Sequence, residues 1–169
     1  MEIIRGTVVW KFEDHFNADR IVGSKNIGEK NIDILGQVCM AEFDPDFVKR
    51  VRPGDIMIAG RNFGYGHPHQ QSIQSLKKVG ISCVIAESFY PGWYRMAFFH
   101  NLPVMVCSAI SKLAEVGQEL EVDFITGKIK NFNTGKTIQG EPIPPFLIEV
   151  LHAGGLVPFL RKQAISNKP

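Results

Sequence analysis

Three apolar strands alternate with two helical stretches in the middle of the chain, and few folds accommodate that order. We expect the strands at 56–59, 81–86 and 104–107, and the helices at 68–79 and 93–100. The stretch at 81–86 is almost entirely apolar, as in a parallel strand covered on both faces. Strands and helices that alternate in this way indicate a parallel sheet with right-handed crossovers. The centre of the chain is therefore expected to be α/β.

Both flanks of this unit are rich in strands. Residues 3–12 form a β-rich stretch, and 119–124 alternates polar and apolar residues before a Thr-Gly turn and a return strand at 128–130. This pattern is typical of a β-hairpin. A proline-rich connector then leads to a last helix, which is expected to stop at Gly154. We expect one domain, residues 1–169.

Composition excludes several classes of protein. The chain has 169 residues, of which 44% are hydrophobic and 21% charged, the balance of a soluble globular domain. Its basic residues are scattered, which argues against a nucleic-acid surface, and no stretch approaches the roughly 18 apolar residues of a membrane span. The three cysteines form no C-x-x-C pair. Without a secretion signal this usage indicates reduced thiols in the cytoplasm, and the spacing does not suit an iron–sulfur cluster.

A glycine-spaced segment directly after the strand at 56–59 is the main candidate for a binding site. Residues 60–66 read GRNFGYG, and His67, Pro68 and His69 follow; we refer to residues 60–69 as the glycine loop. Glycines at such spacing are expected to give backbone freedom at positive φ or close approach to a ligand. Pro68 suits the first position of a helix, which would place His67 at or near the N-cap. The helix dipole there attracts a carboxylate, and an imidazole is a competent base near neutral pH.

Six segments in register resemble the small subunit of 3-isopropylmalate dehydratase. They are DHFNAD at 14–19, the segment 60–66, AESF at 86–89, NLP at 101–103, PPFL at 144–147 and AGGL at 153–156. Together they cover nearly the whole chain. The resemblance implies a three-layer β/β/α swivelling domain, as in the last domain of aconitase.

The same resemblance implies an enzyme subunit. In this family a large subunit carries a [4Fe–4S] cluster, whose open iron is a Lewis acid for the substrate, and the small subunit closes over the site. The reaction is the reversible dehydration and hydration of a small hydroxy-acid, in leucine biosynthesis for 3-isopropylmalate. This chain would then bind no cofactor itself, and its partners would be the large subunit and the hydroxy-acid, with no nucleic acid and no membrane.

The sequence departs from the family in the loop that carries the chemistry. The family pattern G-x-G-S-S-R-E, in which the first Ser is the base and the Arg holds a substrate carboxylate, reads GYGHPHQ at 64–70. A second family arginine is lost where S-F-A-R-I becomes SFYPG at 88–92. From the resemblance we expect His67 to be the catalytic base. The expected substrate-binding residues are Gly64, Gly66, His69, Asn62 and Asp19.

Two other interpretations remain open at this point. The altered loop fits a non-catalytic relative that kept the fold and the partner interface as a binding or regulatory subunit. His67 and His69 also form an H-x-H pair that, with a third ligand such as His100, would suit a metal. The family's specificity loop corresponds to residues around 21–34, and this stretch does not identify the substrate.

Overall fold

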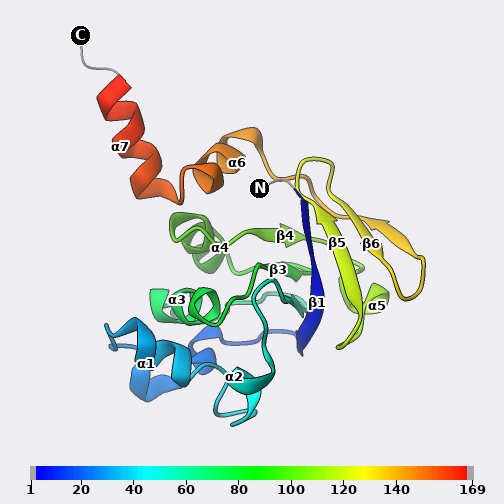
Figure 1. Ribbon diagram of the computed structural model, residues 1–169, viewed down its shortest axis with the longest axis horizontal. Coiled ribbons are helices and arrows are strands. Elements are labelled where there is room, and N and C mark those ends of the chain that lie inside the picture. The colour runs from blue at the N-terminus through cyan, green and yellow to red at the C-terminus, as the bar shows by residue number, and fades with distance from the viewer. Residues whose placement is uncertain (1–2, 167–169) are drawn as a thin grey trace.

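A computed structural model of the protein describes residues 3–166. These residues fold around one seven-stranded sheet (Figure 1). The strand order is β4-β3-β2-β1-β5-β6-β7. The strands are β1 (Ile3–Phe12), β2 (Ile56–Ala59), β3 (Cys83–Ala86), β4 (Val104–Val106), β5 (Glu119–Asp123), β6 (Lys128–Asn131) and β7 (Thr137–Gln139). Strands β1 to β4 pair in parallel, whereas β1, β5, β6 and β7 pair antiparallel. Both the parallel unit and the hairpin predicted from sequence are confirmed.

The helices complete a three-layer arrangement. They are η1 (Ala18–Ile21), η2 (Ser24–Asn26), α1 (Ile32–Gln37), α2 (Phe47–Arg50), α3 (Gln70–Lys78), α4 (Pro91–Phe99), α5 (Ile110–Leu113), α6 (Pro145–His152) and α7 (Leu156–Ser166). Figure 1 shows α3 and α4 on one side of the parallel strands, with α1 next to α3, and the antiparallel strands β5 and β6 on the other side. The expected β/β/α architecture is confirmed.

Strand β1 joins the two halves of the sheet. Its first half, Ile3–Thr7, pairs with β5, and its second half pairs with β2 from Val8 onwards. The register shifts between Val8 and Trp10, and such a bulge lets a strand bend and twist. Gly6 lies just before this point, where an added Cβ would meet the carbonyl of Gly54. The bend places the antiparallel layer over one face of the parallel one.

Burial explains why the strands form as they do. Every residue of β2 and β3 is buried, as expected for parallel strands covered on both faces. In β5 only alternate residues, Leu120 and Val122, are buried, because its other face is open to solvent. Side chains from both halves of the sheet belong to one hydrophobic cluster. None of the helices between residues 3 and 166 is long and apolar enough to cross a membrane.

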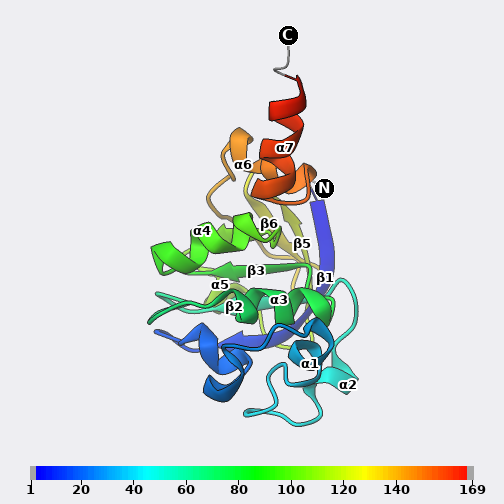
Figure 2. The same cartoon turned by 90° about the vertical axis from the view of Figure 1, so that its left-hand side faces the viewer.

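Two helix starts differ from the prediction. α4 begins at Pro91, two residues earlier than expected, with the proline in the first turn, where its missing N–H costs nothing. α3 begins at Gln70 and not at Pro68. The last predicted helix does stop before Gly154 and Gly155, which have φ of 92° and 112°. The chain then forms an unpredicted helix, α7, that projects from the body of the molecule (Figure 2).

Candidate functional site

Three loops meet at the carboxyl ends of β1, β2 and β3. They span residues 13–19, 60–69 and 87–90, and each follows directly on its strand. Because the three strands are parallel neighbours, their carboxyl ends lie on one edge of the sheet. In open α/β sheets ligands bind at this edge. The glycine loop is the middle one of the three.

Phe63 anchors the glycine loop in the core. Its side chain is fully buried and packs against Phe12, Phe16 and Trp93 at ring-centroid distances of 5.0, 5.9 and 4.9 Å. Its backbone N–H donates to the Ser88 carbonyl at 3.0 Å, and its carbonyl accepts from the Tyr90 N–H at 2.8 Å. The loop is thus tied to its neighbours on both sides, and the residues after Phe63 start from a fixed point.

Gly64 and Gly66 both have positive φ, of 84° and 103°, which confirms the expectation of special backbone geometry. A Cβ on Gly64 would lie 2.5 Å from the Cβ and Cγ of Trp93. A Cβ on Gly66 would lie 3.0 Å from the Nδ2 atom of Asn17. Their role in substrate binding stays a prediction, but both positions require glycine for structural reasons.

Asp14 and Arg61 form an ion pair at the rim of the site. The Oδ1 atom of Asp14 accepts the backbone N–H of Arg61 at 2.7 Å, and Oδ2 accepts from Nε at 2.9 Å and Nη2 at 2.7 Å. The backbone and side-chain hydrogen bonds from Arg61 lower the pKa of the Asp14 carboxyl, and the side-chain hydrogen bonds to Asp14 raise the pKa of the guanidinium. One edge of the Arg61 guanidinium is therefore already occupied by a carboxylate of the same chain.

Asn62 is linked to both neighbouring loops. Its backbone N–H donates to the Oγ atom of Ser88 at 2.8 Å, and its side-chain Nδ2 lies 3.1 Å from the Nδ1 atom of His15. Asn62 and His15 have φ of 55° and 56°, which is uncommon outside glycine. Sequence reasoning missed His15 as a partner. The only available signal was that Asn and His tolerate this backbone region better than most residues.

His69 and Asp19 are brought together from positions 50 residues apart. The backbone N–H of His69 donates to Oδ1 of Asp19 at 3.0 Å, and its ring Nδ1 lies 2.8 Å from Oδ2. Asp19 itself is held by Asn17, whose Oδ1 accepts the Asp19 backbone N–H at 2.9 Å. Two residues predicted to bind substrate independently are therefore one unit.

The predicted start of α3 was wrong, and the contact between Asp19 and His69 explains why. His69, and not His67, is the N-cap residue, with an extended backbone at φ −109° and ψ 145°. Asp19 takes both the backbone N–H and the ring nitrogen of His69, which holds this residue outside the helix. Pro68 consequently lies before the cap and not at the first helical position.

The ring of His67 is exposed at the tip of the loop. Within the described part of the chain it makes a ring contact with His69, at 6.3 Å between centroids, and no hydrogen bond is found for it. Among residues 3–166, no group of three or more His, Cys, Asp or Glu is placed to hold a metal ion. His67, His69 and His100 therefore do not form a three-ligand site.

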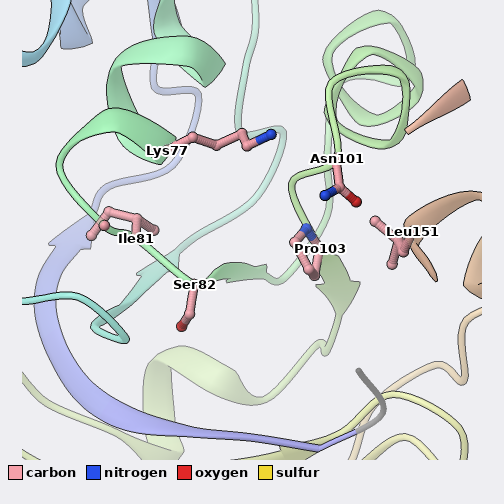
Figure 3. Close-up of a pocket in the computed structure, with 7 residues that line it drawn as sticks. Lys77, Ile81, Ser82, Asn101, Pro103 and Leu151 are labelled. Atoms are coloured by element: carbon pink, nitrogen blue, oxygen red, sulfur yellow. The ribbon is translucent and has the colours of Figure 1, made fainter. Parts of the chain in front are cut away.

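A cavity of about 230 Å³ lies at the opposite edge of the sheet, where β3 and β4 begin (Figure 3). Lys77 extends from the end of α3 toward Asn101 on one side, and Ile81, Pro103 and Leu151 line the remainder. The Lys77 ammonium donates to the carbonyl of His100 at 2.6 Å. None of the residues lining this cavity belongs to the three loops, so it is separate from the site described above.

The chain is similar over nearly its full length to proteins of one kind. It is 44% identical to the isopropylmalate/citramalate isomerase small subunit of Methanocaldococcus jannaschii, over 98% of each chain. It is 38% identical to the 3-isopropylmalate dehydratase small subunit of Ruminiclostridium cellulolyticum, over 93% of this chain and 96% of that one. No family model matches the chain. A crystal structure of 3-isopropylmalate dehydratase from Methanocaldococcus jannaschii superposes with a TM-score of 0.87, at 32% identity and 96% coverage of both chains. The chain belongs to the family of 3-isopropylmalate dehydratase small subunits.

Proposed function

We propose that this chain is the small subunit of a two-subunit hydro-lyase that removes water from, and adds water to, a small hydroxy-acid. The observation that carries the proposal is that the similarity to dehydratase small subunits spans nearly the whole chain. The loop lies at the edge of the sheet where ligands bind in open α/β folds. The large subunit would cover this edge and complete the site.

The residues of this chain do not fit an iron–sulfur cluster. A cluster requires several thiolates close together, whereas Cys39, Cys83 and Cys107 are all buried free thiols. Burial raises the pKa of Cys39 and of Cys83 to about 12, which disfavours the thiolate form that binds iron. We therefore assign the [4Fe–4S] cluster of the complex to the large subunit. Buried, reduced thiols also support a cytoplasmic location.

The part of this chain in the reaction would be to bind and orient the hydroxy-acid and to move a proton. The imidazoles of His67 and His69 project from a loop that is fixed at Phe63. The amino end of the nine-residue helix α3 lies directly behind them, and its dipole favours the carboxylate of a substrate. The loop thus supplies proton-transfer groups without the arginine of the family pattern.

The loss of that arginine points to a substrate other than the one used by most relatives. An arginine binds a carboxylate through two parallel hydrogen bonds, whereas an imidazole offers one N–H to a ligand. We propose that the substrate is a malate-like hydroxy-acid whose second carboxylate is held less tightly than in 3-isopropylmalate dehydratase. The scattered basic residues and net charge of +2 support a small-molecule ligand over a nucleic acid.

Co-expression with the large subunit of the same organism tests the proposal. We expect a stable complex that interconverts a hydroxy-acid and its unsaturated acid, followed by the ultraviolet absorbance of the double bond, while the small subunit alone shows no turnover. A complex that forms but acts on none of a panel of substituted malates would favour a binding or regulatory subunit. Turnover by the isolated small subunit would contradict the two-subunit proposal.

A further inference from the structure

We infer that His69, rather than His67, is the proton-transfer residue of the glycine loop, and that Asp19 positions it. The inference rests on the proposed hydro-lyase function and assigns roles within that site. Its basis is the difference in how the two imidazoles are held, which the sequence pattern does not reveal.

Asp19 holds His69 at two points. One carboxylate oxygen binds the backbone N–H of His69 at 3.0 Å and the other lies 2.8 Å from ring Nδ1. The side chain of Asp19 is 14% exposed and that of His69 is 36% exposed. The carboxylate is thus shielded while part of the ring remains accessible. The hydrogen bond to the backbone fixes the position of His69, and the hydrogen bond to the ring fixes the orientation of its imidazole.

The hydrogen bond also determines which ring nitrogen is available. A carboxylate only accepts hydrogen bonds, so Nδ1 of His69 carries the proton and Nε2 of the neutral ring has a free lone pair. When Nε2 accepts a proton, the carboxylate stabilises the imidazolium that forms. This Asp–His arrangement is the one that makes an imidazole an effective base in unrelated enzymes.

His67 lacks every one of these features. Its ring is exposed and has no hydrogen-bond partner among the described residues, so no group selects its tautomer or its orientation. With 6.3 Å between the two ring centroids, one small substrate can contact both imidazoles. His67 therefore suits a substrate contact, and His69 suits proton transfer.

The proton balance of the step is simple. Nε2 of His69 takes the proton from the carbon next to a substrate carboxylate, and the electron pair of that C–H bond forms the C=C bond. The C–O bond to the hydroxyl on the adjacent carbon breaks and hydroxide departs. When His69 gives up that proton and returns to its neutral form, the proton and the hydroxide make up the one water released. Hydration runs the same steps in reverse, with Nε2 of His69 delivering a proton to the carbon.

Kinetics of the assembled complex distinguish the two histidines. We expect His69→Gln to lower kcat by on the order of 100-fold or more, the usual contribution of a positioned acid–base group, with a smaller change in KM. His67→Gln, the matched control, should raise KM and keep kcat within about tenfold. Asp19→Asn should lower kcat because its amide can stabilise the wrong tautomer, and Asp19→Glu should restore part of it. Loss of kcat in His67→Gln with retention in His69→Gln would overturn the inference.

A second measurement does not depend on turnover. In ¹⁵N-labelled full-length small subunit, NMR of the imidazole nitrogens should show His69 as the Nδ1–H tautomer, and Asp19→Asn should abolish that preference. An Nε2–H tautomer at His69 in the wild type would contradict the proposed pair. If the wild-type complex proves inactive while NMR shows the Nδ1–H tautomer, the hydro-lyase proposal fails and the Asp19–His69 pair stands.

Discussion

Gly64 is the residue of the loop whose substitution has the clearest structural cost. Gly64→Ala places a Cβ 2.5 Å from the side chain of buried Trp93 at a φ of 84°. We expect a loss of roughly 2–4 kcal/mol in the free energy of unfolding, from backbone strain and overpacking together. Gly117→Ala is the control, because Gly117 has a similar φ of 89° with no atom near the added Cβ, and strain alone should cost about 1–2 kcal/mol. Equal losses in urea unfolding would show that contact with Trp93 is unimportant.

Asp14 is expected to make the stability of the protein depend on pH in the acid range. Hydrogen bonds from Arg61 lower the pKa of the Asp14 carboxyl, so its contribution to stability is present above the unfolded value of about 3.9 and is lost as the pH falls through the lowered folded value. We expect Asp14→Asn to lower the urea midpoint at pH 7 and to do so less at pH 3. Asp46→Asn, which removes only the exposed ion pair with Lys49, should change the pH 7 midpoint little. A deficit in Asp14→Asn that does not shrink in acid would contradict this account.

The side-chain partners in the site were beyond sequence reasoning. The resemblance selected Asp19, Asn62 and His69 individually, and the structure shows that Asp19 pairs with His69 and Asn62 with His15. These pairs join positions 47 and 50 residues apart. They form because β1 and β2 are neighbours and release their loops at the same edge. Local patterns carry no information about such contacts.

At the scale of elements, strands were predicted better than helix ends. The apolar runs of β2 and β3 and the alternation in β5 are strong local signals. Strand β2 has the predicted bounds, and β3 and β5 lie within the predicted segments, with β3 beginning two residues later than expected. The start of α3 depended instead on a tertiary contact, the bond from His69 to Asp19. Helix α7 was missed because the stop signal of Gly154 is genuine, and the packing of Phe159 against Phe146, at 5.3 Å between ring centroids, lies beyond it.

The burial of all three cysteines predicts how fast their thiols react. Desolvation raises the pKa of Cys83 and Cys39 to about 12 and also raises that of Cys107. Because the thiolate is the reactive form, a disulfide reagent such as DTNB should react slowly with all three cysteines of the folded protein at pH 8. The same protein in denaturant should release three equivalents rapidly. If one equivalent of thiol per protein reacted rapidly in the folded state, the segment around that cysteine would open readily.

At the scale of the whole molecule, the family resemblance predicted the arrangement of the layers, which the periodicity of the sequence did not. Local patterns predict a parallel unit and a hairpin, but not that one long strand, β1, belongs to both. The bulge between Val8 and Trp10 and the close approach of Gly6 to Gly54 create that connection. The family pattern implied the resulting β/β/α layers, and a TM-score of 0.87 to the dehydratase from Methanocaldococcus jannaschii bears this out.

The assembled complex offers a test of whether the altered loop is an alternative solution to the same chemistry. His69→Arg alone removes the proposed proton-transfer residue, and we expect it to abolish turnover even though Asp19 is well placed to pair with the new guanidinium. Adding His67→Ser and Pro68→Ser rebuilds the S-S-R part of the family pattern, with the first serine as base and the arginine as a two-point carboxylate anchor. Pro68→Ser is included because serine restores the backbone N–H that proline lacks.

The triple variant should recover at least tenfold in kcat/KM for 3-isopropylmalate relative to His69→Arg. A triple variant as inactive as the single one would mean that residues outside the loop, in the region of 21–34 or on the large subunit, determine which acid this complex accepts.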